Sequence, residues 1–182
     1  MKREWCLDEL AQHWSLLFEE QELLKGKTDK TRLGFALMLK FFELECCFPS
    51  YTGEIPPQVV EYVAAQVSVS ARLWHHYDLT SRTARCHRRQ IRLLLGFREC
   101  VKDDIDHLSD WLIKEVIPQD IDQKRAIEAL WQRCRELQLE PPSHHRTESI
   151  VLNAIEEYEK KFFRTVAAKL SARACMRLDA LL

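Results

Sequence analysis

Apolar side chains recur every three or four residues along this chain, most clearly in TDKTRLGFALMLKFFELECCF, residues 28–48. The positions in phase are Leu33, Ala36, Leu37, Lys40, Phe41 and Leu44. This spacing puts one stripe on a helix, whereas the side chains of a strand alternate with a period of two. The segment therefore predicts a buried helix, and Pro49 and the following Gly53 and Pro56 mark its end.

Few residues interrupt helices of this kind, because the 182 residues include only four glycines and six prolines. Hydrophobic residues make up 46% of the chain, which is enough for a core in a chain of this length. We expect an all-α, multi-helical protein with two helical modules, residues 1–108 and 109–182, that carry helix-turn-helix-like elements.

The cysteines and the N-terminus indicate where the protein resides. Seven cysteines, with Cys46 and Cys47 adjacent, are typical of reduced thiols rather than of a disulfide framework. The opening MKREWCLDELAQHW lacks the apolar core of a signal peptide, and no apolar run approaches the roughly 20 residues that cross a bilayer. We expect a cytoplasmic protein with no membrane partner.

The segment LTSRTARCHRRQIRLLLGFREC, residues 79–100, holds six arginines and no acid before Glu99, although the net charge of the chain is only -1. On a helical wheel, one arc of about 100° carries the apolar positions and the adjoining arc of about 120° carries the basic ones. The apolar arc holds Ala84, His87, Ile91, Leu94 and Leu95, and the basic arc holds Arg82, Arg85, Arg88, Arg89 and Arg92.

This separation predicts a helix that packs by one face and binds nucleic acid by the other. A guanidinium group binds phosphate in a fork or reads the edge of a guanine. Ser81 and Thr83 add hydroxyls where the helix begins, beside amide groups that also bind phosphate. The alternative is a solvated face paired with acids of the next helix, such as Asp103, Asp104, Asp106 and Asp110.

The preceding segment has the pattern of a helix-turn-helix. Its apolar positions are Val60, Val63, Ala64 and Val67. Ser70 is placed to cap a second helix that carries Arg72, His75 and His76. An ordinary tight corner between helices needs the same small residues and cap, so both interpretations stay open.

A second hairpin follows in RAIEALWQRCRELQLEPPSHHRTESIVLNAI, residues 125–155. Ile127, Leu130, Trp131 and Leu137 form its predicted apolar side, and we expect both Trp111 and Trp131 to be buried. After the two prolines, the first turns of a helix hold Ser143, His144, His145, Arg146 and Thr147, which are suited to DNA contacts. An ordinary capped hairpin of helices explains these residues equally well.

No pattern in the chain predicts catalysis. The acids between Asp103 and Asp110 fit the solvated face of an amphipathic helix better than a divalent-metal site. The adjacent histidine pairs do not have the spacing of zinc ligands, because neighbouring residues on a helix point about 100° apart. We expect neither a catalytic residue nor a metal or other cofactor.

Four segments of the chain carry a family resemblance: RLGFALMLKFFELECCFP (32–49), IPPQVVEYVAAQVSV (55–69), YDLTSRTARCHRRQIRLLLGFRE (77–99) and LDALL (178–182). Together they resemble the N-terminal region of the Tn-three family of replicative transposases. The similarity runs over nearly the whole chain. Its most specific parts are the RLGFA block and the block from His87 to Arg98.

The resemblance implies a helical, DNA-binding region that recognises the terminal inverted repeats of a transposon in double-stranded DNA. It implies that the acidic catalytic residues and their magnesium ions belong to a catalytic domain absent from this chain, so the chain itself is not an enzyme. The other partner would be the remainder of the transposase, and the chain would be associated with the nucleoid when it is bound to DNA. The alternative is a helical protein-interaction module that docks an acidic partner or the rest of the transposase.

Overall fold

The computed structural model describes residues 2–170, so the LDALL block (178–182) lies outside it. Apart from loops and two short strands, the described chain is helical, which confirms the all-α class. It folds as two compact units that divide between Glu99 and Cys100. The division predicted between residues 108 and 109 falls inside a single helix, α6 (Lys102–Trp111), which belongs to the second unit.

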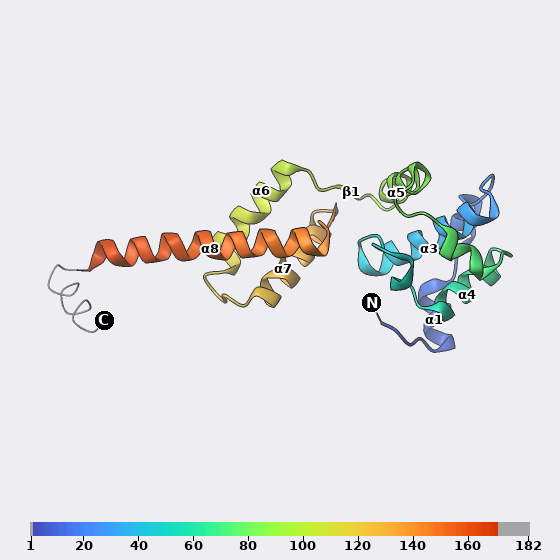
Figure 1. Ribbon diagram of the computed structural model, residues 1–182, viewed down its shortest axis with the longest axis horizontal. Coiled ribbons are helices and arrows are strands. Elements are labelled where there is room, and N and C mark those ends of the chain that lie inside the picture. Colours follow the sequence, from blue (N-terminus) through green and yellow to red (C-terminus); the bar gives the residue numbers. More distant parts are fainter. Residues whose placement is uncertain (1, 171–182) are drawn as a thin grey trace. The chain divides into compact units, whose positions relative to one another are not determined.

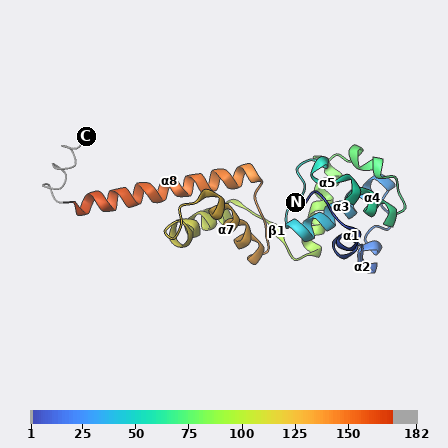
Figure 2. The same ribbon diagram turned by 90° about the horizontal axis from the view of Figure 1, so that it is seen from below.

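Helix α3 is the centre of the first unit (Figures 1 and 2). Every residue from Leu33 to Phe42 on it is buried, because the other helices of the unit pack around it. The predicted buried helix is thereby confirmed. The elements of this unit are α1 (Leu7–Trp14), α2 (Phe18–Glu22), α3 (Asp29–Glu45), η1 (Thr52–Glu54), α4 (Pro57–Gln66), η2 (Ala71–His76), α5 (Arg82–Leu94) and β1 (Arg98–Glu99).

Glycine is required at position 34, inside the RLGFA block. A Cβ atom there would lie 2.2 Å from the ring of Tyr77, far inside van der Waals contact. That ring cannot retreat, since it stacks on Trp74 and its hydroxyl is hydrogen-bonded to His87 at 2.7 Å. The glycine therefore lets α3 approach the segment that leads into α5.

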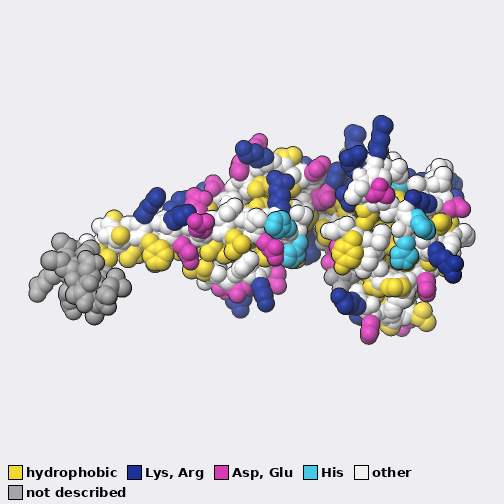
Figure 3. All heavy atoms as spheres, in the orientation of Figure 1, with side chains coloured by type: hydrophobic (Ala, Val, Ile, Leu, Met, Phe, Trp, Pro, Cys, Tyr) yellow, Lys and Arg dark blue, Asp and Glu magenta, His cyan; other side chains and the backbone are white. Residues whose placement is uncertain are grey.

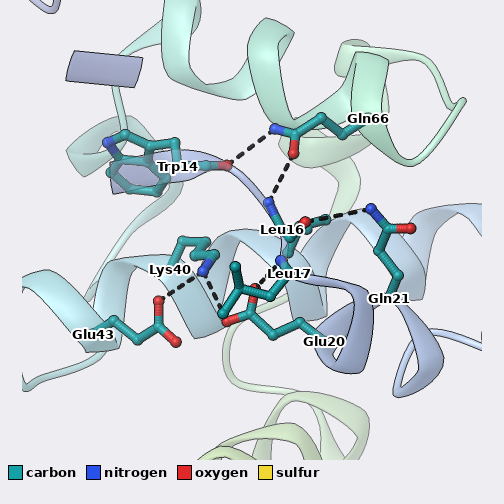
Figure 4. Close-up of polar contacts among 8 residues, drawn as sticks. All are labelled: Trp14, Leu16, Leu17, Glu20, Gln21, Lys40, Glu43 and Gln66. Atoms are coloured by element: carbon teal, nitrogen blue, oxygen red, sulfur yellow. Dashed lines mark hydrogen bonds and ion pairs between the residues drawn. The ribbon is translucent and has the colours of Figure 1, made fainter. Parts of the chain in front are cut away.

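A buried ion cluster joins α2 to α3 (Figure 4). The Nζ atom of Lys40 lies 2.7 Å from Glu20 and 2.9 Å from Glu43, and Lys40 and Glu20 are both buried. The second oxygen of Glu20 accepts a hydrogen bond from the backbone nitrogen of Leu17. Gln66 of α4 bonds the backbone of Trp14 and Leu16 in the same corner. These contacts hold α2 and the segment between α1 and α2 against α3 and α4.

The predicted helix-turn-helix is only partly right. The apolar face of α4 is buried as predicted, at Val60, Val63, Ala64 and Val67. However, the segment after Ser70 is the six-residue 3₁₀ helix η2, and the Ser70 side chain does not cap it. Trp74 is buried there and donates its indole N–H to the carbonyl of Thr52, which ties this short segment to η1.

The second unit is a small helical bundle around Leu112, Ile117, Leu130 and Val151. Its elements are α6, the π-helical turn η3 (Leu112–Val116) that continues α6, α7 (Gln123–Glu136), β2 (Leu139–Glu140) and α8 (His144–Lys169).

Three apolar side chains of this unit are more exposed than the sequence predicted. Trp111 and Trp131 are only half-buried at the edge of the core, where Arg133 lies over the Trp111 ring and the Trp131 indole reaches Thr147. Leu137 is exposed because it is the C-cap residue of α7, beyond the face that packs on the core.

Candidate nucleic-acid interface

Helix α5 is fixed in place by its N-cap and by its apolar face. The Ser81 hydroxyl accepts a hydrogen bond from the backbone nitrogen of Ala84 at 3.1 Å, as an N-cap serine should. Ala84, His87 and Ile91 are buried against the core, which confirms the predicted apolar arc at these positions. The prediction is wrong for Leu94, which lies at the edge of the arc in the last turn and is exposed.

Opposite the buried face, α5 presents a basic outer face, which we define as Arg82, Arg85 and Arg89. All three side chains are exposed, and Figure 3 shows lysine and arginine side chains projecting where α5 lies. Cys86, Gln90 and Leu93 are exposed between and beside them. The face therefore offers three guanidinium groups within about two helical turns, with no carboxylate on the same helix.

Arg88 and Arg92 do not belong to this outer face, contrary to the predicted arc of five arginines. The Arg88 guanidinium lies 5.6 Å from the centre of the Phe48 ring, and its Nε atom is buried without a hydrogen-bond partner in the part of the chain described. Arg92 is 15% exposed and lies 3.5 Å from Glu99. Both occupy the border between the two arcs, where the long side chain packs against the unit.

The start of α5 is less open to an anion than the sequence suggested. The Ser81 hydroxyl is used twice, as the N-cap acceptor and as a donor to the Asp78 carbonyl. The Asp78 carboxylate accepts hydrogen bonds from the backbone and hydroxyl of Thr80, which hold the pKa of Asp78 below its ordinary value. An ionised carboxylate thus lies beside the helix start. Thr83 is exposed and remains available.

One cation that sequence reasoning had missed, Lys27, lies beside the basic outer face. Lys27, from the loop before α3, donates a hydrogen bond to the Gln90 side chain at 3.2 Å. Its ammonium group also lies 4.4 Å from the centre of the Phe35 ring, and partial burial lowers the pKa of Lys27. Lys27 and Gln90 are 63 residues apart, so no local pattern could have joined them.

A neutral histidine supports α5 from within. His87 packs edge-on against Phe35, and its Nδ1 atom lies 2.7 Å from the Tyr77 hydroxyl. Burial, and then the positive charge of Lys27, lower the pKa of His87 to about 4. Burial raises the pKa of Tyr77, so its hydroxyl stays protonated and shares a hydrogen bond with the Nδ1 atom of the neutral ring.

Only some of the residues predicted to form a second contact, at the start of α8, are exposed. Ser143, His145 and Arg146 are exposed, and His144 is exposed with its Nδ1 atom 3.3 Å from Glu148. Thr147 is fully buried, contrary to a role in DNA contact. Its hydroxyl donates to the Pro142 carbonyl and accepts from the Trp131 indole, so it joins the turn to the core.

Residues 2–170 contain no cluster of three or more histidine, cysteine or acidic side chains placed to hold a metal ion. Over the same range, no helix combines the length and the apolar character needed to span a bilayer.

Comparison with known proteins places the chain in a family. No curated protein matches it. Residues 1–154 match the family described as "domain of unknown function (DUF4158)", a stretch that includes the whole first unit and the second unit as far as Ala154, the last buried residue of α8. Because this match covers most of the 182 residues, the chain belongs to the DUF4158 family.

Proposed function

We propose that this chain is the DNA-binding region of a transposase related to the Tn-three family, and that it recognises terminal inverted repeats during DNA transposition. The observation that carries this proposal is the basic outer face of α5, where Arg82, Arg85 and Arg89 are exposed together. An α-helix fits the major groove of B-DNA, where arginine binds the O6 and N7 atoms of guanine and the flanking phosphates.

The contacts of α5 support this proposal because they leave the outer face free and rigid. The N-cap and the buried residues fix the helix, so the backbone that carries the arginines loses little freedom on binding. Lys27 adds a fourth cation beside Gln90, whose amide could bind an adenine edge. We include Ser143, His145 and Arg146 as a second contact, mainly for phosphate.

The resemblance to transposases supports the choice of DNA and of terminal repeats. Two of the blocks that carry it lie at α3 and α5, where Gly34 allows the close approach and the arginines form the outer face. On this proposal the chain performs no DNA cleavage, and magnesium serves only the catalytic domain. The second partner of the chain is the remainder of the transposase. The chain acts in the cytoplasm, on the nucleoid.

A second candidate function is a protein-interaction module that uses the same arginines to dock an acidic partner. The exposure of Arg82, Arg85 and Arg89 favours it as much as it favours DNA. The two functions differ in the competitor that displaces the partner.

Changing both Arg85 and Arg89 to glutamine should weaken DNA binding on the order of 100-fold, because two charge-assisted contacts are lost. Each lost phosphate contact should also make the slope of log affinity against log salt shallower by about 0.9, and thus by nearly two in the double variant. The measurement is fluorescence anisotropy at several salt concentrations, on a duplex that the wild-type chain selects from a random library.

The matched control is Arg125→Gln with Arg135→Gln, which removes the same charge from exposed positions of α7. This variant should keep both affinity and slope. If the Arg85 and Arg89 variant is folded by circular dichroism and binds like the wild type, α5 is not a DNA surface.

Cys86 provides a footprint of the same face without any substitution. It is exposed on the outer side of α5, within one turn of Arg82 and Arg89, while Cys6 is exposed at the start of α1. Saturating duplex should slow alkylation of Cys86 by N-ethylmaleimide severalfold and leave Cys6 unchanged, as measured by peptide mass spectrometry. Protection by polyglutamate but not by DNA would favour the protein-interaction function instead.

A further inference from the structure

The exposed surface of α5 is divided along its length into a basic and an uncharged part. Beside the basic outer face runs a neutral strip, which we define as Cys86, Gln90 and Leu93, all exposed. On a wheel with Ala84 at zero, the three arginines lie between about 100° and 160° and the strip lies between about 180° and 240°. The exposed residues of α5 span about 100° to 280°, so the strip occupies the centre of the exposed surface and the arginines occupy one edge.

A cation from another part of the chain lies on the opposite side of the strip. The Nζ atom of Lys27 is 3.2 Å from the Gln90 side chain and 4.4 Å from the centre of the Phe35 ring. Its positive charge also contributes to the lowered pKa of His87. His87 lies at about 300° on the same wheel, so Lys27 lies beyond Gln90, away from the arginines. Cations therefore border the neutral strip on both sides.

This arrangement matches the cross-section of the major groove of B-DNA. Phosphates line the two walls of the groove, and the edges of the bases form its floor. The groove is about 12 Å wide, close to the diameter of an α-helix with its side chains. When Arg89 and Lys27 face opposite walls, the strip between them faces the base edges.

The contact with Lys27 fixes the amide of Gln90 in one orientation. An ammonium group only donates hydrogen bonds, so the atom that it contacts is the amide oxygen Oε1. One lone pair of Oε1 remains free, and the Nε2 donors lie on the side away from Lys27. A glutamine amide then accepts from N6 of adenine and donates to N7, whereas guanine presents acceptors at both positions.

Leu93 extends the strip with an apolar side chain. It follows Gln90 by three residues, so the two side chains are neighbours on the helix surface. Leu93 is 70% exposed, although Ile91 on the opposite side of the helix is fully buried. The methyl group of thymine is the apolar group on the floor of the major groove, and packing against it would remove part of Leu93 from water.

We propose that the neutral strip of α5 reads A·T base pairs, through Gln90 on the N6 and N7 atoms of an adenine and Leu93 on a thymine methyl group. Lys27 is a positioning residue, because it orients the Gln90 amide. This inference rests on the proposed DNA-binding function and adds to it the bases that the strip recognises.

The first test changes the base that residue 90 recognises. The full-length wild type, Gln90→Glu and Gln90→Ala are each used to select duplexes from a random library, which are then sequenced. A glutamate only accepts hydrogen bonds and suits the N4 amino group of cytosine, so Gln90→Glu should exchange adenine for cytosine at one position. Gln90→Ala should lower the preference for adenine there on the order of 10-fold. Gln132→Glu, at an exposed glutamine of α7, is the matched control and should select the wild-type sequence.

The second test removes the thymine methyl group. Deoxyuridine replaces thymidine at each A·T pair of the selected duplex in turn, and fluorescence anisotropy measures the affinity. At one position the wild type should bind about fourfold more weakly, as expected for one buried methyl group, whereas Leu93→Ala should bind both duplexes equally. Leu7→Ala, at a 78% exposed leucine of α1, should keep the fourfold difference.

The role of Lys27 is tested by the base preference rather than by the affinity. Lys27→Met should lower the preference for adenine in the wild type and should not lower it further in Gln90→Ala. A lysine that only contacts phosphate would weaken binding to all sequences alike.

Two kinds of failure are distinguishable. The inference is wrong if the Gln90 variants select the wild-type sequence, if no deoxyuridine replacement weakens binding, or if the wild type binds duplex without selecting any sequence. In each of these cases the arginine-dependent salt slope still supports DNA binding. A wild type that binds no duplex removes the proposed function and this inference together.

Discussion

Lys40→Met should destabilise the protein by about 3–5 kcal/mol, a large part of the stability of a domain of this size. Lys40 is buried and is the cation between two carboxylates, at 2.7 Å from Glu20 and 2.9 Å from Glu43. Burial, and then the Glu20 carboxyl, already raise the pKa of Glu43. Without the ammonium group, two carboxyl groups would share this site with no compensating charge. Urea denaturation followed by circular dichroism measures the loss.

Two further variants separate the buried cluster from lysine replacement in general. Lys25→Met removes an exposed lysine that pairs with Glu22 and should cost less than about 1 kcal/mol. Adding Glu20→Gln to Lys40→Met should restore part of the stability, since it removes one of the unpaired carboxylates. A Lys40→Met chain as stable as the Lys25 variant would show that the cluster does not hold α2 against α3.

The second large effect is an acid-induced loss of about 3 kcal/mol of stability from His87 alone. Its pKa is about 4 in the folded protein and about 6.5 in an unfolded chain, so the unfolded chain binds the proton more readily. The contribution is therefore fully present above pH 6.5 and is lost as the pH falls from about 6.5 to 4. Burial is the main cause, because a charged ring would lie against Phe35 and the Tyr77 hydroxyl.

The measurement is the free energy of unfolding of the wild type and of His87→Gln between pH 4 and 7. Glutamine cannot take up a proton, so the difference between the two proteins should shrink as the pH falls. Taking the difference removes the titration of Glu43, Asp78 and other groups common to both. His75→Gln, at an exposed position of η2, should follow the wild type at every pH. A difference between the wild type and His87→Gln that stays constant with pH would show that folding does not change the pKa of His87.

The sequence predicted the helix from Asp29 to Glu45 and the apolar face of α5, because both depend on residues a few positions apart on one helix. It did not separate the exposed arginines from the packed ones. A helical wheel gives the direction of a side chain but does not show which neighbouring elements cover it. Arg88 contacts Phe48, which comes from another part of the chain. The Lys27 contribution is hidden for the same reason, since that contact joins residues distant in sequence.

Periodicity by itself determined the helical class, the buried face of α4 and the segregation of charge on α5. Local composition did not determine which part of a helix the core covers. On α8, Thr147 is buried by Trp131 and Pro142, whereas Phe162 and Phe163 extend past the core. The sequence likewise shows Lys40 in phase with a buried stripe, but only packing supplies the two carboxylates that make its burial stable. Tertiary structure decided these points because burial and ion pairing depend on contacts between elements, which no single helix contains.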